Sequence, residues 1–350
     1  MMPRWKSSVG PTVLVAVAAS AIGVVNAAST CNQRRTCDLQ AWGQVPPPPP
    51  SAGSGGDTRG TAAASDRETR RLTLGATGSL ELKTFAGDIT VVGGSGRDVQ
   101  VEIVRQSVAR TDEEAKAGLK DIRVVTEHIG DHAALSVVSA TRRPSARVRV
   151  DYTVSVPAGT RVVASTVMGN VSVKGLKGEL DVQATSGNIT IANAAQVSSA
   201  RTISGNIALT DAASPGGLAL NAVSGNILLE RVKTRQLDVD VTTGNVVVKN
   251  GAGEQVQIRS LSGSIDYTGP VSRGGRYQLQ THSGELRLLI TGGTGFDLQA
   301  SSFAGEIKAD SSLTSKAVGM TPQSLRATVG DGSAHVVAIT FSGNVTIGRK

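Results

Sequence analysis

Apolar and polar residues alternate along most of this chain, and the alternation is organised around one short phrase that recurs between residues 168 and 288. The phrase is a small residue, a glycine, an asparagine or other polar residue, and then alternating aliphatic residues. Its copies read MGNVSV, SGNITI, SGNIAL, SGNILL, TGNVVV, SGSIDY and SGELRL. Their glycines follow one another at intervals of 18 to 21 residues: Gly169, Gly187, Gly205, Gly225, Gly244, Gly263 and Gly284. A fixed period of this length is typical of a repeat architecture.

Each period holds two short strands and two turns. Between Gly225 and Gly244, every second residue of both strands is apolar: Ile227, Leu229, Leu237, Val239 and Val241. Such alternation predicts half-buried strands. One unit cannot bury its apolar face alone, but stacked units can. The sequence therefore predicts an all-β fold, a single-stranded parallel β-solenoid (β-helix) of about 19-residue coils.

This architecture places equivalent residues of successive phrases next to each other. Ile207, Ile227 and Val246 should lie in successive parallel strands, with backbones about 4.8 Å apart. A sandwich of hairpins would instead pair strands that are close in sequence and antiparallel. The narrow interior of a coil should hold mostly Val, Ile, Leu and Ala, and the low aromatic content, 3%, agrees with that.

The glycine of each phrase is expected at a corner with positive φ, where a Cβ atom would clash. An asparagine follows the glycine in most of these phrases, as at Asn188, Asn206, Asn226 and Asn245. A turn asparagine can bond to nearby backbone, and a column of them can form an amide ladder. Ligand binding is the alternative role for this column. We favour a structural corner, because solenoid corners need a column of turn residues.

The rhythm changes at both ends of the chain. Looser copies of the phrase begin at Ala86, Ala304 and Ser342, and Gly343 lies 38 residues, or two periods, after Gly305. Residues 71–165 otherwise break the period and predict an N-terminal β-rich cap with one short helix, followed by the solenoid repeats over residues 166–350. The helix is expected from Thr111 to Ile122, with Thr111 and Glu114 forming a capping box. Residues 314–332 are interpreted as a loop or insert.

Residues 1–27 are typical of a signal peptide. Arg4 and Lys6 precede an apolar run of 13 residues, which is short for a membrane span, and small residues end it at Ala27. Cleavage should leave no transmembrane span in the mature chain, and an uncleaved anchor is the alternative. The sequence therefore predicts an exported protein, located in the periplasm, at the outer envelope surface or secreted.

Residues 28–70 predict a disordered Pro/Gly/Ser-rich spacer, because five consecutive prolines at positions 46–50 precede a Gly/Ser-rich stretch. Cys31 and Cys37 are the only cysteines, and a local disulfide between them is expected in an oxidising compartment. Lipidation of Cys31 is the alternative, although Ala28 and Thr30 depart from the usual pattern. A zinc site would need more ligands.

The formal charge of +8 is modest for 350 residues. The densest basic cluster could attract an acidic surface or polymer: Arg142, Arg143, Arg147 and Arg149. Nucleic-acid binding would also need clustered base-stacking aromatics, which the sequence lacks. We therefore expect no nucleic-acid partner.

No catalytic, cofactor-binding or metal-binding set is evident. His128 and His132 flank a Gly-containing stretch that predicts a hairpin turn, and His282 is interpreted as a packed or corner residue. The acids expected on successive coils do not share a column: Asp238, Asp240, Asp266 and Glu285. No nucleophile–His–acid set, phosphate loop or dinucleotide motif occurs.

The phrases SGNITI, SGNIAL, SGNILL, TGNVVV and SGSIDY resemble a bacterial adhesin-like repeat family, a domain of unknown function similar to the head domain of auto-transporter adhesins. The segment YTVSVPAGTRVVASTVMGNVSV also resembles the family's entry into its repeats, and the resemblance spans about Leu72 to Ile347. It implies a single-stranded β-solenoid at the cell envelope. It supplies no catalytic residues.

Together these features predict an exported, non-enzymatic cell-envelope or surface protein. It would be an adhesin-like scaffold that binds an envelope polymer or a surface protein along the solenoid face. A carbohydrate-active β-helix enzyme and an envelope-stress accessory protein are the alternatives. Cleavage of polysaccharides would distinguish the enzyme from the scaffold.

Overall fold

A computed structural model describes residues 62–75, 77–140 and 146–350 of the chain. These residues belong to one compact unit, Asp57–Lys350. The predicted signal peptide, Cys31, Cys37 and the proline run lie outside the described residues, as do Arg142 and Arg143 of the basic cluster.

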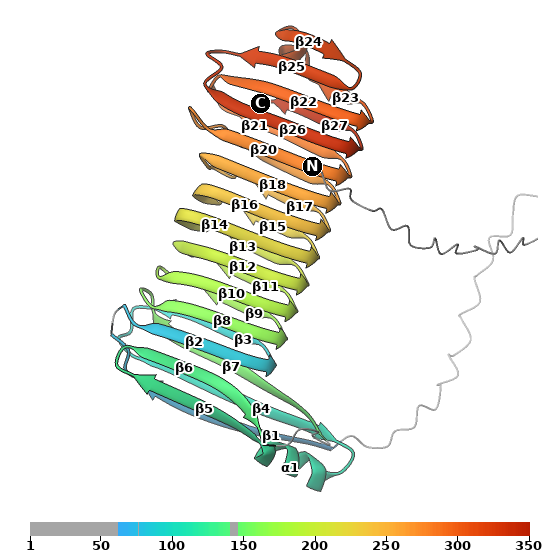
Figure 1. Ribbon diagram of the computed structural model, residues 1–350. Helices are drawn as coiled ribbons and strands as arrows, with labels where there is room; N and C mark the ends of the chain where they lie inside the picture. The colour runs from blue at the N-terminus through green and yellow to red at the C-terminus, as the bar shows by residue number, and fades with distance from the viewer. Residues whose placement is uncertain (1–61, 76, 141–145) are drawn as a thin grey trace, which may run out of the picture. The chain divides into compact units, whose positions relative to one another are not determined.

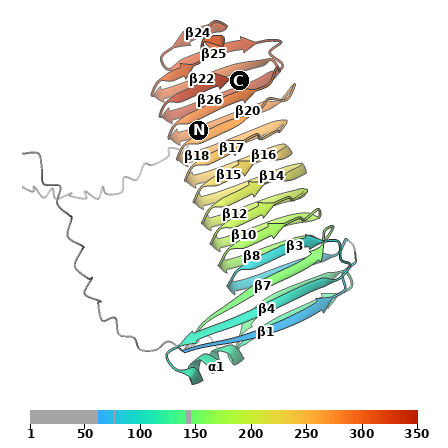
Figure 2. The same cartoon turned by 180° about the vertical axis from the view of Figure 1, so that it is seen from behind.

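The described residues form two long sheets in which most neighbouring strands are parallel (Figures 1 and 2). The chain alternates between the sheets, passing from a strand of one to a short strand of the other. The all-β prediction is confirmed. In the described part of the chain, two helices accompany the sheets, α1 (Asp112–Asp121) and α2 (Ser311–Thr314).

The 14-stranded sheet contains, in order across the sheet, β24 (Ala317–Thr321), β25 (Ser324–Val329), β22 (Phe296–Ala304), β26 (Ala334–Ser342), β20 (Arg276–Ser283), β18 (Gln255–Ser262), β16 (Lys233–Thr243), β14 (Ala213–Ser224), β12 (Gln196–Ser204), β10 (Glu179–Ser186), β8 (Arg161–Met168), β2 (Ser79–Ala86), β6 (His132–Ser139) and β5 (Ile122–Ile129). The 13-stranded sheet contains β1 (Ala62–Leu72), β4 (Val99–Ala109), β7 (Arg147–Pro157), β3 (Ile89–Gly94), β9 (Val171–Lys174), β11 (Ile189–Ala192), β13 (Ile207–Thr210), β15 (Ile227–Glu230), β17 (Val246–Lys249), β19 (Ile265–Pro270), β21 (Leu286–Thr291), β27 (Val345–Arg349) and β23 (Ile307–Ala309).

Equivalent residues of successive phrases are neighbours in the 13-stranded sheet. Ile207 of β13 pairs with Ile227 of β15, which pairs with Val246 of β17, and both pairings are parallel. All three side chains are buried between the two sheets. The core there is mainly aliphatic, because strand alternation points Val, Ile, Leu and Ala inward from both sheets.

The stack begins earlier in the chain than residue 166, the predicted start of the repeats. β2 pairs in parallel with β8, and β3 pairs in parallel with β9, so residues 79–94 form a layer of the stack. The chain then continues through β4, α1, β5, β6 and β7 before it reaches β8. β6 and β7 add one more layer to the stack, because they pair in parallel with β2 and β3. β1 also begins at Ala62, within the range assigned to the spacer.

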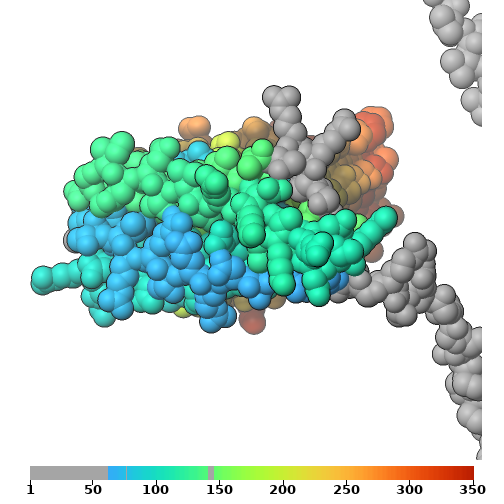
Figure 3. All heavy atoms as spheres, turned by 90° about the horizontal axis from the view of Figure 1, so that it is seen from below, coloured from blue at the N-terminus to red at the C-terminus, as the bar shows by residue number. Residues whose placement is uncertain are grey.

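The N-terminal end of the stack is covered by antiparallel strands. β4 lies between β1 and β7, while β5 pairs with β6. Figure 3 looks at this end and shows the blue-to-green N-terminal segments covering it. The helix predicted from Thr111 to Ile122 is present as α1, and the Thr111 hydroxyl accepts a hydrogen bond from the Glu114 N–H at 3.2 Å.

The C-terminal end differs from the sequence prediction in two ways. The last strands, β26 and β27, are inserted between β20–β21 and β22–β23, so Gly343 lies next to Gly284 and not two periods beyond Gly305. Residues 314–332, interpreted as a loop or insert, are an insert with strands of its own. β24 and β25 form an antiparallel hairpin there, and β25 pairs with β22 at the end of the sheet.

Candidate functional site

The Gly-Asn phrases form one corner of each layer. The glycines named in the sequence analysis have φ between 142° and 151°: Gly169, Gly187, Gly205, Gly225, Gly244, Gly263 and Gly284. Each also lies against the preceding layer, and a Cβ atom on Gly225 would be 1.9 Å from the Gly205 carbonyl oxygen. Gly305 of the looser copy lacks the positive φ.

The asparagines of the phrases bond from layer to layer. The Asn206 N–H donates to Asn188 Oδ1 at 2.9 Å, and the Asn226 N–H donates to Asn206 Oδ1 at 2.8 Å. The ladder continues from Asn245 to Asn226 and from Ser264 to Asn245, each at 2.9 Å. Since these side-chain oxygens already accept backbone N–H groups, their contacts favour the structural interpretation of the column over ligand binding.

An ion pair joins two layers at their other corner. Asp211 and Arg231 both have positive φ, 52° and 54°, and Arg231 Nη2 donates to Asp211 Oδ2 at 2.8 Å. The hydrogen bonds and charge of Arg231 lower the pKa of the Asp211 carboxyl below its ordinary value. Both side chains are solvent-exposed, so this pair stabilises the corner only weakly.

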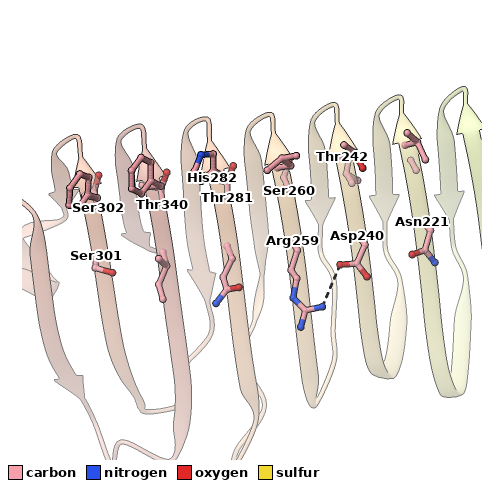
Figure 4. A pocket seen from close by; sticks show the side chains of 18 residues that line it. Asn221, Asp240, Thr242, Arg259, Ser260, Thr281, His282, Ser301, Ser302 and Thr340 are labelled. Atoms are coloured by element: carbon pink, nitrogen blue, oxygen red, sulfur yellow. Dashed lines mark ion pairs between the residues drawn. The ribbon is translucent and has the colours of Figure 1, made fainter. Parts of the chain in front are cut away.

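A groove runs along the outer face of the 14-stranded sheet (Figure 4). One side is formed by the residue just before the small residue of each phrase, a column that we call the ridge: Val223, Thr242, Leu261, His282, Phe341 and Phe303. Two residues earlier on each strand lies a second column, which we call the inner row: Asn221, Asp240, Arg259, Gln280, Ile339 and Ser301. The strands β14, β16, β18, β20, β26 and β22 supply both columns in this order.

The ridge exposes large apolar side chains to solvent. Leu261 is 56% exposed, Phe341 48% and Phe303 71%. The residues between ridge and inner row, such as Thr281 and Thr340, point inward and are buried. Strand alternation therefore places one column in the core and the two flanking columns in the groove. The groove has a volume of about 880 Å³.

Three rings stack at the C-terminal end of the groove. The centroids of His282 and Phe341 are 4.8 Å apart with planes 9° from parallel, and those of Phe341 and Phe303 are 4.8 Å apart and 7° from parallel. This spacing equals the distance between neighbouring strands. His282 therefore packs in the ridge, and its neighbours along the column are exposed apolar residues.

The groove carries balanced charge. Among the residues that line it, the Asp, Glu, Lys and Arg types are represented by Asp240 and Arg259 alone. Arg259 Nη1 lies 3.6 Å from Asp240 Oδ1 (Figure 4). Asn221, Gln280 and Ser301 contribute neutral polar groups to the same row. The arrangement can bind an extended molecule through apolar contacts on the ridge and hydrogen bonds from the inner row.

The other candidate residues lie apart from this groove. His128 lies at the end of β5, and His132 is the first residue of β6. Because these two strands pair antiparallel, the predicted hairpin turn is confirmed. Asp266 and Glu285 do not line the groove. Among the described residues there is no group of three or more His, Cys, Asp or Glu side chains placed to hold a metal ion. Within the same residues, none of the helices has the length and apolarity needed to cross a membrane.

The exposed ridge was not predicted from the sequence, from which His282 was interpreted only as a packed or corner residue. The alternation of inward-pointing and outward-pointing residues along each strand could have revealed the ridge. Leu279 and Thr281 point inward, so His282 and its equivalents must point outward.

Comparison with known proteins identifies the family. Residues 77–348 match the family model described as Toastrack DUF4097. The chain belongs to the Toastrack DUF4097 family. This agrees with the resemblance carried by the Gly-Asn phrases. No curated protein matches the chain.

Several solved structures are similar to this Toastrack chain at low identity. A candidate adhesin from Parabacteroides distasonis is 10% identical, with a TM-score of 0.37, and covers 81% of this chain and 97% of its own. A candidate lipid-binding protein from the same species is 14% identical, with the same TM-score and coverage. A candidate cell adhesion protein from Clostridium sporogenes is 11% identical, with a TM-score of 0.24, and covers 82% of this chain and 100% of its own.

Proposed function

We propose that this Toastrack chain is an exported, non-enzymatic protein of the cell envelope or surface that binds an extended polymer along the ridge and inner row. The observation that carries the proposal is the groove itself, which crosses six strands and combines exposed apolar side chains with neutral polar groups. Binding a surface polymer in this way is an adhesin-like activity.

The architecture in this proposal is a single-stranded parallel β-solenoid of about 19-residue coils with an irregular N-terminal cap. The parallel, in-register pairing of β13, β15 and β17 supports it. A stack of this kind repeats the same surface positions at each layer, which suits a partner that is itself long and regular.

Export is part of the same proposal. Residues 1–27 act as a signal peptide. Residues 28–61, the part of the predicted spacer that precedes β1, separate the export site from the folded body. Sequencing the N-terminus of the protein recovered from the envelope fraction should give a start near Ala28. A mature chain that still begins at Met1 or Met2 would contradict cleavage.

Polymer binding can be tested with two variants. Leu261→Ser combined with Phe341→Ser removes the centre of the ridge, and Val318→Ser is the control, because Val318 is 82% exposed on β24 and does not line the groove. Exposed positions of this kind tolerate substitution with little change in stability. The immobilised proteins are exposed to a panel of soluble linear polysaccharides, neutral and acidic, and of extended peptides.

We expect the wild type and Val318→Ser to retain at least one of these polymers and the double variant to lose it. We also expect no new reducing ends in the polysaccharide samples, since an enzyme would release them. Equal retention by the wild type and the double variant across the whole panel would contradict the proposed function. New reducing ends would favour the carbohydrate-active alternative.

A further inference from the structure

The dimensions of the groove fit one extended chain. Six strands about 4.8 Å apart give the groove a length of roughly 24 Å. A peptide of about eight residues in the polyproline II conformation, which rises about 3.1 Å per residue, covers that length. A linear chain can therefore contact all six strands.

From β14 to β26, the apolar side chains of the ridge lie on every second strand. Outside this stretch, exposed apolar residues of the same column lie on adjacent strands: Ile203 next to Val223, and Phe303 next to Phe341. Val223, Leu261 and Phe341 are separated by one strand each, and the intervening strands place Thr242 and His282 on the ridge. The apolar period is therefore about 9.6 Å. A ligand that uses all three contacts must present an apolar group with the same period.

Among peptide conformations, this period selects polyproline II. Polyproline II has three residues per turn and a rise of about 3.1 Å, so every third side chain returns to the same edge after about 9.3 Å. An extended β-strand repeats its side chains after about 6.7 Å, which does not match the apolar residues of the ridge. Over the two intervals from Val223 to Phe341, the spacing of every third polyproline II residue differs from the spacing of the ridge side chains by a total of only about 0.6 Å.

We propose that the groove binds a linear proline-rich peptide in the polyproline II conformation, with every third residue packed against Val223, Leu261 and Phe341. This inference rests on the proposed function and specifies the polymer. Proline rings supply apolar surface at little further cost in conformational entropy, because the ligand is already extended before it binds.

The inner row complements such a peptide. A polyproline II chain makes no internal hydrogen bonds, so its carbonyl oxygens need donors, and proline has no N–H group that needs an acceptor. Asn221, Arg259 and Gln280 line the groove and carry side-chain N–H donors. Asp240 and Arg259 are paired with each other, so the groove favours an uncharged ligand.

A linear neutral glycan is the rival occupant, because its hydroxyl groups can also bond to the inner row. The two occupants predict different binding profiles, and a direct comparison separates them.

The test uses a fluorescent peptide of ten prolines, about 31 Å long, a Gly/Ser peptide of equal length and a neutral linear gluco-oligosaccharide. All protein variants carry serine in place of the five prolines at positions 46–50, so that the chain's own proline run cannot compete. Fluorescence anisotropy should show saturable binding of the proline peptide and none of the Gly/Ser peptide. Leu261→Ser should weaken binding about tenfold, the effect of losing about 1.4 kcal/mol, whereas Thr242→Ser and Val318→Ser should change it less than about twofold.

Equal weakening by Thr242→Ser and Leu261→Ser would overturn the assigned period and therefore the polyproline ligand. Binding of the oligosaccharide but not of the proline peptide would also overturn this inference and leave the proposed function intact. If none of the probes or panel polymers distinguishes the ridge double variant from the wild type, both proposals fail.

Discussion

At the residue scale, the Gly-Asn corner combines a backbone conformation and a close approach that both require glycine. Gly225 has φ 150°, and the carbonyl of the preceding layer occupies the space where a Cβ atom would lie. The same two constraints recur at each regular phrase, so glycines occur at regular intervals in the sequence, at the positions where successive layers contact each other. This is why the corners could be predicted from the sequence.

Replacement of a corner glycine should therefore destabilise the fold strongly. We expect Gly225→Ala to lower the free energy of unfolding by at least ~2 kcal/mol, through backbone strain and displacement of the Gly205 carbonyl. Gly216→Ala is the matched control, because Gly216 is exposed with no atom within 4 Å of its Cβ position. Thermal melts of both variants provide the measurement, and equal melting temperatures would rule out the corner constraint.

The ridge was harder to predict from the sequence because its residue types differ along the column. Val223, Leu261 and Phe341 alternate with Thr242 and His282 over most of it, and the column belongs to one surface only when the strands are stacked in register. The stack of His282, Phe341 and Phe303 forms because β26 lies between β20 and β22. The spacing of the phrases along the sequence does not predict that strand order.

At the element scale, the short strands from β9 to β19 are linked to their neighbours by backbone pairing and by the asparagine ladder. Asn226 accepts the Asn245 N–H and donates its own N–H to Asn206. In the layer formed by β2 and β3, Asp88 has the same role and accepts the Asn170 N–H at 2.7 Å. At this position the accepting side-chain oxygen can therefore belong to an amide or to a carboxylate.

This equivalence predicts a difference between two substitutions. Asn226→Ala should destabilise the chain by about 1 kcal/mol and speed hydrogen exchange at the Asn245 amide, because that N–H loses its acceptor. Asn226→Asp retains an acceptor and should protect the Asn245 amide nearly as well as the wild type does. Exchange measured residue by residue by NMR distinguishes the variants, and unchanged protection in Asn226→Ala would exclude the ladder as a source of stability.

The sequence predicted elements unevenly for physical reasons. Helix α1 carries a local signal, since the Thr111 side chain caps it by accepting a hydrogen bond from the Glu114 N–H within its own first turn. Strand β24 carries almost none: its residues are mostly exposed on an edge, so no alternation of buried and exposed positions marks it. An edge strand with few packing contacts forms because the neighbouring strand of the sheet pairs with it, and its own residue types have little influence.

At the scale of the whole folded unit, both ends of the stack leave the simple order of the repeats. Residues 79–94 form a layer beneath β8 and β9, and the final strands β26 and β27 insert before β22 and β23. Phrases of similar sequence fit against one another in several orders, so the glycine period alone cannot specify which layer lies next to which. That part of the fold depends on tertiary pairing.

The inserted layer leads to a prediction about cooperativity. A chain that ends at Ser333 lacks β26 and β27, which separate β22 and β23 from the rest of the stack. Without them, β22 loses its parallel partner, and buried residues such as Leu279 and Leu298 lose part of their cover. Because layers in a repeat fold contact mainly their neighbours, the loss should remain local.

Hydrogen exchange followed by mass spectrometry would measure this. We expect the truncated chain to lose protection in residues 296–329 while residues 171–250 remain protected, because the latter keep both neighbouring layers. A chain ending at Ile347 is the control, since it retains the buried Val345 and Ile347 of β27. Full protection of β22 in the chain that ends at Ser333 would show that β26 is not its essential neighbour. Loss of protection throughout residues 171–250 would instead show that the stack unfolds as one cooperative unit.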